Sequence, residues 1–122
     1  GNGIEITDLR IQFEVEKVSA VGDVTDNAIR VVKGGAIGAT DRSSGTLWGG
    51  TDAYVSYGGA TDFWGETWTP AQINASNFGV AISGKTAALG GTISIDHVRA
   101  TVWFSVPKPF HSTHVARLLH LP

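Results

Sequence analysis

The chain has 122 residues, of which 16 are glycine and none is cysteine, with 16% charged side chains and a net charge of −2. A chain of this length fits a single domain with one core. The lack of cysteine excludes disulfides and thiolate chemistry, and the lack of a basic excess gives no electrostatic basis for binding nucleic acid. No apolar run reaches bilayer length, so we expect no membrane span.

The first third of the chain predicts three strands. In Ile4–Val18 the apolar residues alternate, but the phase of the alternation changes at Thr7-Asp8, which predicts a bulge or a crossing between sheets. The small, polar stretch Val18–Asp26 predicts a loop. Strands are then expected over Ala28–Lys33 and Ala36–Thr40, separated by a double-glycine turn.

The middle of the chain is rich in turns. Asp41–Gly50 predicts a loop, and Tyr54–Tyr57 a short strand that ends at a second double glycine. Thr69, Pro70 and Gln72 have the spacing of a capping box and predict a helix of one or two turns. Phe78, Val80 and Ile82 then alternate as a strand.

The last strand of the body is long, Thr92–Phe104, and its phase changes at Asp96-His97. This change mirrors the one in the first strand, so we expect the two long strands to pair antiparallel and to bend at the same corner. Seven or eight short strands with turns every ten or so residues are typical of a sandwich. The sequence therefore predicts an all-β fold over residues 1–104, a two-sheet antiparallel sandwich of jelly-roll-like form.

Residues 105–122 differ from this body. Eleven acidic and seven basic residues precede residue 105, whereas two bases and no acid follow it. Pro107 and Pro109 are expected to stop the sheet, and His114–Leu121 to form a short helix that is marginal without a partner. We therefore predict a docking tail that binds a neighbouring copy. Its binding residues are Phe110, Val115, Arg117, Leu118 and Leu119. The alternative is that a short tail lacks acids by chance.

Large aromatic residues gather between positions 48 and 68. They could form a flat surface platform for sugar rings, with four contacts: Trp48, Tyr57, Trp64 and Trp68. The alternative is that these rings fill one end of a glycine-rich sandwich, since large aromatic side chains favour burial.

No catalytic centre, metal site or cofactor is predicted. Asp96-His97 lacks a nucleophile elbow, and the histidines of the tail lack an accompanying carboxylate. The oxygen-bearing residues of the loops lack calcium-loop spacing and predict local turns instead; they are Asp41, Asp52, Asp62, Glu66, Asn74 and Asn77.

Two stretches carry a resemblance to a known pattern. The segment YGGATDFWGETWTPAQINASNFGVAIS, followed by SIDHVRATVWF, resembles a β-sandwich domain of poorly characterised phage structural proteins and bacterial surface proteins. The opening strands fit the same pattern, over about residues 3 to 104. The resemblance implies an architecture and a setting, but no catalytic residue.

These observations favour a non-enzymatic structural module of a virion-surface or extracellular assembly, such as a decoration, fibre or tail component. Its expected partners are further copies or a larger protein assembly. The alternative function is a carbohydrate-binding module that uses the tryptophan cluster. Because the chain lacks methionine even at position 1, we expect Gly1 to be a processed end or the start of a segment.

Overall fold

The computed structural model describes residues 6–21, 24–86, 92–106 and 112–118, the last of these as backbone only. Strands dominate it. The elements in chain order are β1 (Thr7–Val21), β2 (Val24–Lys33), β3 (Ala36–Asp41), β4 (Ala53–Gly58), α1 (Pro70–Asn74), β5 (Gly79–Thr86), β6 (Thr92–Val106) and β7 (Ser112–Leu118). No helical segment among these residues has the length and apolarity needed to cross a membrane.

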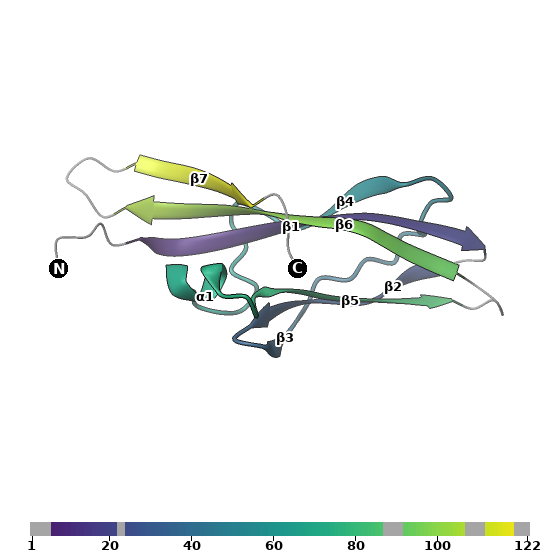
Figure 1. Cartoon of the computed structure of the whole chain (residues 1–122), viewed down its shortest axis with the longest axis horizontal. Coiled ribbons are helices and arrows are strands. Elements are labelled where there is room, and N and C mark those ends of the chain that lie inside the picture. Colours follow the sequence, from purple (N-terminus) through teal and green to yellow (C-terminus); the bar gives the residue numbers. More distant parts are fainter. Residues whose placement is uncertain (1–5, 22–23, 87–91, 107–111, 119–122) are drawn as a thin grey trace.

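The strands form two stacked antiparallel sheets, which confirms the predicted sandwich (Figure 1). One sheet has four strands in the order β4-β1-β6-β7, and the other has three in the order β3-β2-β5. β1 pairs with β6 in the first sheet, and β2 pairs with β5 in the second. The chain therefore passes between the sheets four times, after β1, β3, β4 and β5, which gives the jelly-roll-like form.

The two long strands β1 and β6 pair antiparallel, as the sequence predicts. Both phase changes are also present, as register shifts at Thr7/Arg10 and at Glu16/Lys17 opposite Asp96. The expectation of one shared corner is wrong. Because the strands are antiparallel, Thr7 lies opposite Ser105 at one end of the pair, and Asp96 lies near Glu16 toward the other.

The predicted loop over Val18–Asp26 is also wrong. β1 continues to Val21 and β2 begins at Val24. Alternation continues around this stretch, but besides Val24 the buried inward side chains are polar: Lys17, Ser19 and Asp26. Apolar alternation does not reveal the end of β1 or the start of β2, because the inner residues there include a lysine, a serine and an aspartate.

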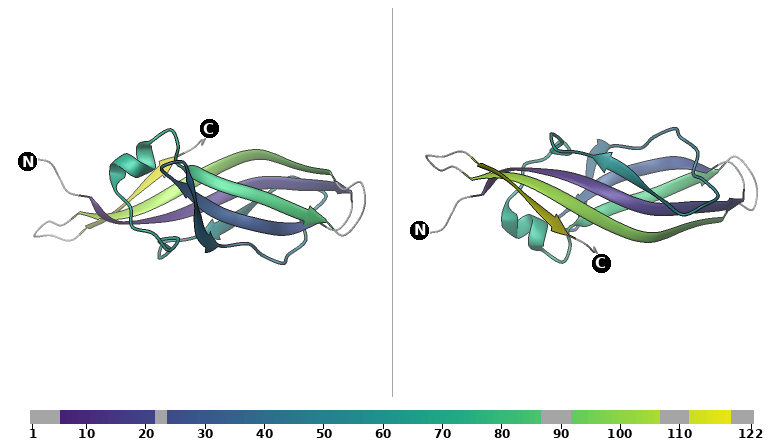
Figure 2. Two further views of the ribbon diagram at one scale, coloured as in Figure 1. Left: turned by 90° about the horizontal axis from the view of Figure 1, so that it is seen from below. Right: turned by 90° about the horizontal axis from the view of Figure 1, so that it is seen from above.

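The core lies between the sheets and is aromatic near α1, at one end of the sandwich (Figure 2). Phe13 packs edge-on against Trp64, with ring centroids 5.4 Å apart. Trp68 packs edge-on against Phe78 at 5.5 Å. The predicted capping box of α1 is confirmed: Thr69 accepts a hydrogen bond from the Gln72 backbone N–H, and the Gln72 side chain accepts one from the Thr69 N–H.

The predicted helix of the tail is wrong. Residues 112–118 form β7, which pairs with β6 from Ala100 to Val106. A helix of eight residues has few internal hydrogen bonds, whereas a strand beside β6 pairs its backbone with an otherwise open sheet edge. Phe110 and Leu119 lie outside the described residues. Val115, Arg117 and Leu118 belong to β7, a strand of the four-stranded sheet.

Candidate interaction surface

The four aromatic residues of the predicted sugar platform are buried. Trp48, Tyr57, Trp64 and Trp68 expose 5%, 4%, 0% and 8% of their surface. The prediction of a surface cluster is therefore wrong for these residues, because rings enclosed in the core leave no face free for a sugar. Their burial corresponds to the alternative, in which the rings fill the sandwich.

Two of these rings belong to a buried polar cluster that sequence reasoning missed. The Lys17 Nζ donates to Asp26 Oδ1 at 2.8 Å, and the two side chains expose only 6% and 0% of their surface. Asp26 also accepts from Trp48 Nε1 at 2.8 Å and from the Ser44 backbone N–H at 2.9 Å. The Tyr57 hydroxyl lies 2.8 Å from Asp26 Oδ2 and also contacts Lys17 Nζ.

The surroundings of the cluster hold Asp26 in its charged form. Burial alone would raise the pKa of Asp26, but hydrogen bonds from Lys17, Ser44, Tyr57 and Trp48 outweigh burial and lower that pKa below its ordinary value. Burial and the neighbouring carboxylate raise the pKa of Tyr57. The Lys17 ammonium also lies 4.5 Å from the centroid of the Trp48 ring.

This cluster joins the two sheets and does not resemble a reaction site. Lys17 and Tyr57 belong to the four-stranded sheet, and Asp26 to the three-stranded one. Each oxygen of Asp26 is already engaged within the chain. The hollow beside Lys17 and Trp48 has a volume of about 130 Å³, smaller than the roughly 300 Å³ at which small-molecule sites begin.

The other polar candidates of the sequence are spread over the surface. Asp62 pairs with Arg42 at 2.7 Å, and Glu66 with Lys33 at 3.4 Å. His97 lies 3.0 Å from Glu16 rather than in a catalytic arrangement with a nucleophile. In the part of the chain that the structure describes, no three histidine or acidic side chains are grouped to hold a metal ion.

The outer faces of the two sheets differ strongly. Residues directly opposite one another in register point to the same side of a sheet. On the four-stranded sheet, the outward side chains include the ion pairs Glu14–Arg99 and Glu16–His97. This face has the charged character of a surface in contact with water.

The outer face of the three-stranded sheet is mostly apolar, and we call it the apolar face. The register places eleven residues on it, of which Arg30, Asp41 and Lys85 are charged: Thr25, Ala28, Arg30, Val32, Ile37, Ala39, Asp41, Gly79, Ala81, Ser83 and Lys85. Ile37 exposes 63% of its surface, more than any other large hydrophobic residue with a described side chain. A strand that is apolar on both sides is typical of a sheet covered on both sides.

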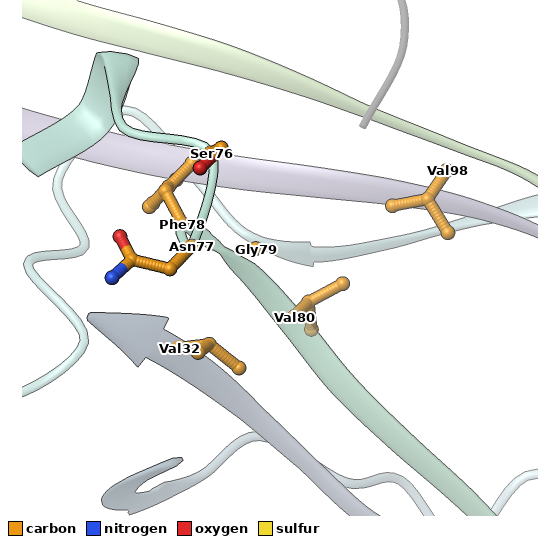
Figure 3. Close-up of a pocket in the computed structure, with 7 residues that line it drawn as sticks. All are labelled: Val32, Ser76, Asn77, Phe78, Gly79, Val80 and Val98. Carbon is orange, nitrogen blue, oxygen red and sulfur yellow. The ribbon is translucent and has the colours of Figure 1, made fainter. Parts of the chain in front are cut away.

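Two hollows border this face along β5. One, of about 420 Å³, is lined by Ala28, Arg30, Ile37, Ala81, Ile82 and Ser83. The other, of about 260 Å³, lies at the start of β5, where Gly79 has no side chain, and is lined by Val80 and Val98 from the two sheets (Figure 3). β5 is also an edge strand, with β2 as its neighbour on one side only.

Comparisons with protein-family models, with curated protein sequences and with solved structures found no match to this chain.

Proposed function

We propose that this chain is a non-enzymatic structural module that associates with further copies of itself in an extracellular or virion-surface assembly. The observation that carries the proposal is the contrast between the two outer faces. One sheet presents ion pairs to water, while the other presents Ile37, Val32 and several alanines. A contiguous apolar face on a small domain marks an interaction site.

Two further observations support an assembly role. The most unusual polar cluster, around Asp26, links the two sheets and uses its hydrogen-bonding groups internally, which suits a rigid unit. The resemblance of the segments around Trp64 and His97 to phage structural and bacterial surface domains supplies the setting. We place the docking element on the apolar face; the docking tail predicted from sequence, of which residues 112–118 form β7, stays a prediction.

The experiment is the solution mass of the whole chain, measured by light scattering and sedimentation equilibrium from about 10 µM to 1 mM. A mass that rises to a defined oligomer supports the proposal. A monomer at every concentration contradicts a self-assembling module. Catalytic turnover on an ester, glycoside or peptide substrate would contradict its non-enzymatic character.

A further inference from the structure

We infer that the partner of the apolar face is the same face of a second copy, related by a two-fold axis. This inference rests on the proposed function and specifies its interface. In such a pair Ile37 of each copy enters the hollow of the other copy, which is lined by Ala28, Arg30 and Ala81. A two-fold contact needs a surface that is complementary to itself.

Shape provides the first argument for a second copy. The face has one large projecting side chain, Ile37, and beside it a hollow of about 420 Å³ whose other side chains are mostly small. When two copies meet across a two-fold axis, the projection of each copy can fill the hollow of the other, so the same contact forms twice. A flat or uniformly concave face would not favour a second copy over another partner.

Charge provides the second argument. Arg30 lies opposite Asp41 in register, so both belong to this face, and Asp41 is exposed at the end of β3. Each copy therefore brings one positive and one negative charge, side by side, to the contact, while Lys85 lies toward the end of β5. Two identical copies can place Arg30 of one near Asp41 of the other without a net like-charge cost.

The size of the face predicts a weak dimer. Three strands about 4.8 Å apart and about eight residues long span roughly 14 by 26 Å. This is below the area of about 800 Å² per partner that stable complexes bury. The contact is expected to form when copies are held at high local concentration, as in an assembly. The test must therefore trap the contact as well as measure it.

Single cysteines provide the trap, because the chain has none of its own. A two-fold contact brings residue 37 of one copy to residue 81 of the other. We expect a mixture of the Ile37→Cys and Ala81→Cys variants to form a mixed disulfide dimer under mild oxidation, at a yield at least five times that of a mixture of Leu47→Cys and Ala81→Cys. Leu47 is the matched control, since it is 58% exposed but lies outside the face.

Equilibrium measurements give an independent readout. Ile37→Lys removes the apolar projection and places a cation next to Arg30 of the other copy, so we expect the dimer dissociation constant to rise more than tenfold. Ile37→Glu should weaken the dimer less, because its carboxylate can meet that arginine. Leu47→Lys should leave the dissociation constant within twofold.

The outcomes separate the inference from the proposed function. A dimer that is lost with Ile37→Lys and trapped by the mixed cysteines supports both. An oligomer that is insensitive to Ile37→Lys, or that grows without limit instead of closing as a dimer, overturns the inference and leaves the assembly role intact. A chain that stays monomeric, with no mixed disulfide above the Leu47 control, overturns both.

Discussion

Lys17 and Asp26 make one end of the sandwich interior polar. The cost of burying two charges is met there by hydrogen bonds from Trp48, Tyr57 and the Ser44 backbone. Buried ion pairs of this kind contribute little net stability when complete, but are costly to break, because the remaining charge is left without a partner.

Replacing Asp26 tests how much stability is lost when the buried ion pair is broken. We expect Asp26→Asn to lower the free energy of unfolding by about 3–5 kcal/mol, because the Lys17 ammonium then remains buried beside a neutral amide. Glu66→Gln is the matched control: it removes the partner of Lys33 in a pair whose side chains are 23% and 30% exposed, and should cost no more than about 1 kcal/mol. Urea denaturation measures both. Equal losses would contradict a special role for the buried pair.

The same pair predicts a pH dependence. Folding lowers the pKa of Asp26 below its ordinary value of 3.8. Its contribution is therefore fully present above pH 3.8 and is lost as the pH falls through the lower pKa of the folded state. We expect the stability difference between the wild type and Asp26→Asn to be constant from pH 5 to 8 and to shrink below about pH 4. A difference that stays constant down to pH 2 would contradict this assignment.

Much of the secondary structure and strand pairing follows from the sequence. The capping box of α1, the two phase changes and the pairing of the long strands are all local patterns or direct consequences of them. The sequence does not show that β1 and β2 continue through Lys17 and Asp26, because both residues are polar. Only the folded structure shows that they pair with each other in the interior. The sequence does not distinguish a helix from a strand in the tail, because an eight-residue apolar pattern fits either.

Gly58, the last residue of β4, and its neighbour Gly59 differ in the space available for a side chain. Gly58 has a φ of +79°, and a Cβ atom there would lie 2.5 Å from the Ile11 carbonyl oxygen and 2.6 Å from Trp64 Nε1. That nitrogen donates to the same carbonyl at 2.9 Å. The turn therefore fixes the position of the Trp64 ring in the core.

Two alanine substitutions test the turn. Gly58→Ala should lower the free energy of unfolding by about 2–5 kcal/mol, through backbone strain and the displaced Trp64 hydrogen bond. Gly59→Ala should change it by less than about 0.5 kcal/mol, because nothing lies within 4 Å of the added atom. Thermal or urea unfolding distinguishes them. Similar effects at both positions would contradict the role given to Gly58.

The place of β7 in the sheet predicts the effect of truncation. Ending the chain at Val106 removes the seven residues of β7 that pair with β6, and it opens the edge of β6 to other chains. We expect the free energy of unfolding to fall by about 2 kcal/mol or more, with increased aggregation. A truncation at Val106 with unchanged stability would mean that β7 is a detachable tail.

At the scale of the whole molecule, the sandwich has one outer face that carries ion pairs and one that is mostly apolar. The sequence gives few signs of this difference between the two outer faces. Alternation in β2 and β5 predicts one buried and one exposed side, but it does not predict whether the exposed side is polar or apolar. Ala28, Ala81 and Ser83 are small enough to pass as ordinary surface residues. Only the register of β2 with β3 and β5 gathers them around Ile37.

Amide hydrogen exchange tests this arrangement of strands. The amides of β1 should exchange slowest, because β1 has neighbours on both sides and its inner face is buried from Leu9 to Ser19. The outward-facing amides of the edge strand β5 should exchange at least a hundredfold faster. Protection of those β5 amides in dilute solution would contradict a free edge, and it would place the contact between copies at that edge instead of at the apolar face.

The central position of β1 also has a mechanical consequence. β1 is bonded to β6 over most of its length and to β4, on the other side, over Gln12–Lys17. Hydrogen bonds between antiparallel strands run perpendicular to the strands, so a pull along β1 loads both rows of bonds in shear at once. A domain that yields only when many bonds fail together resists tension better than one that can be unzipped bond by bond, which suits a component that must transmit force.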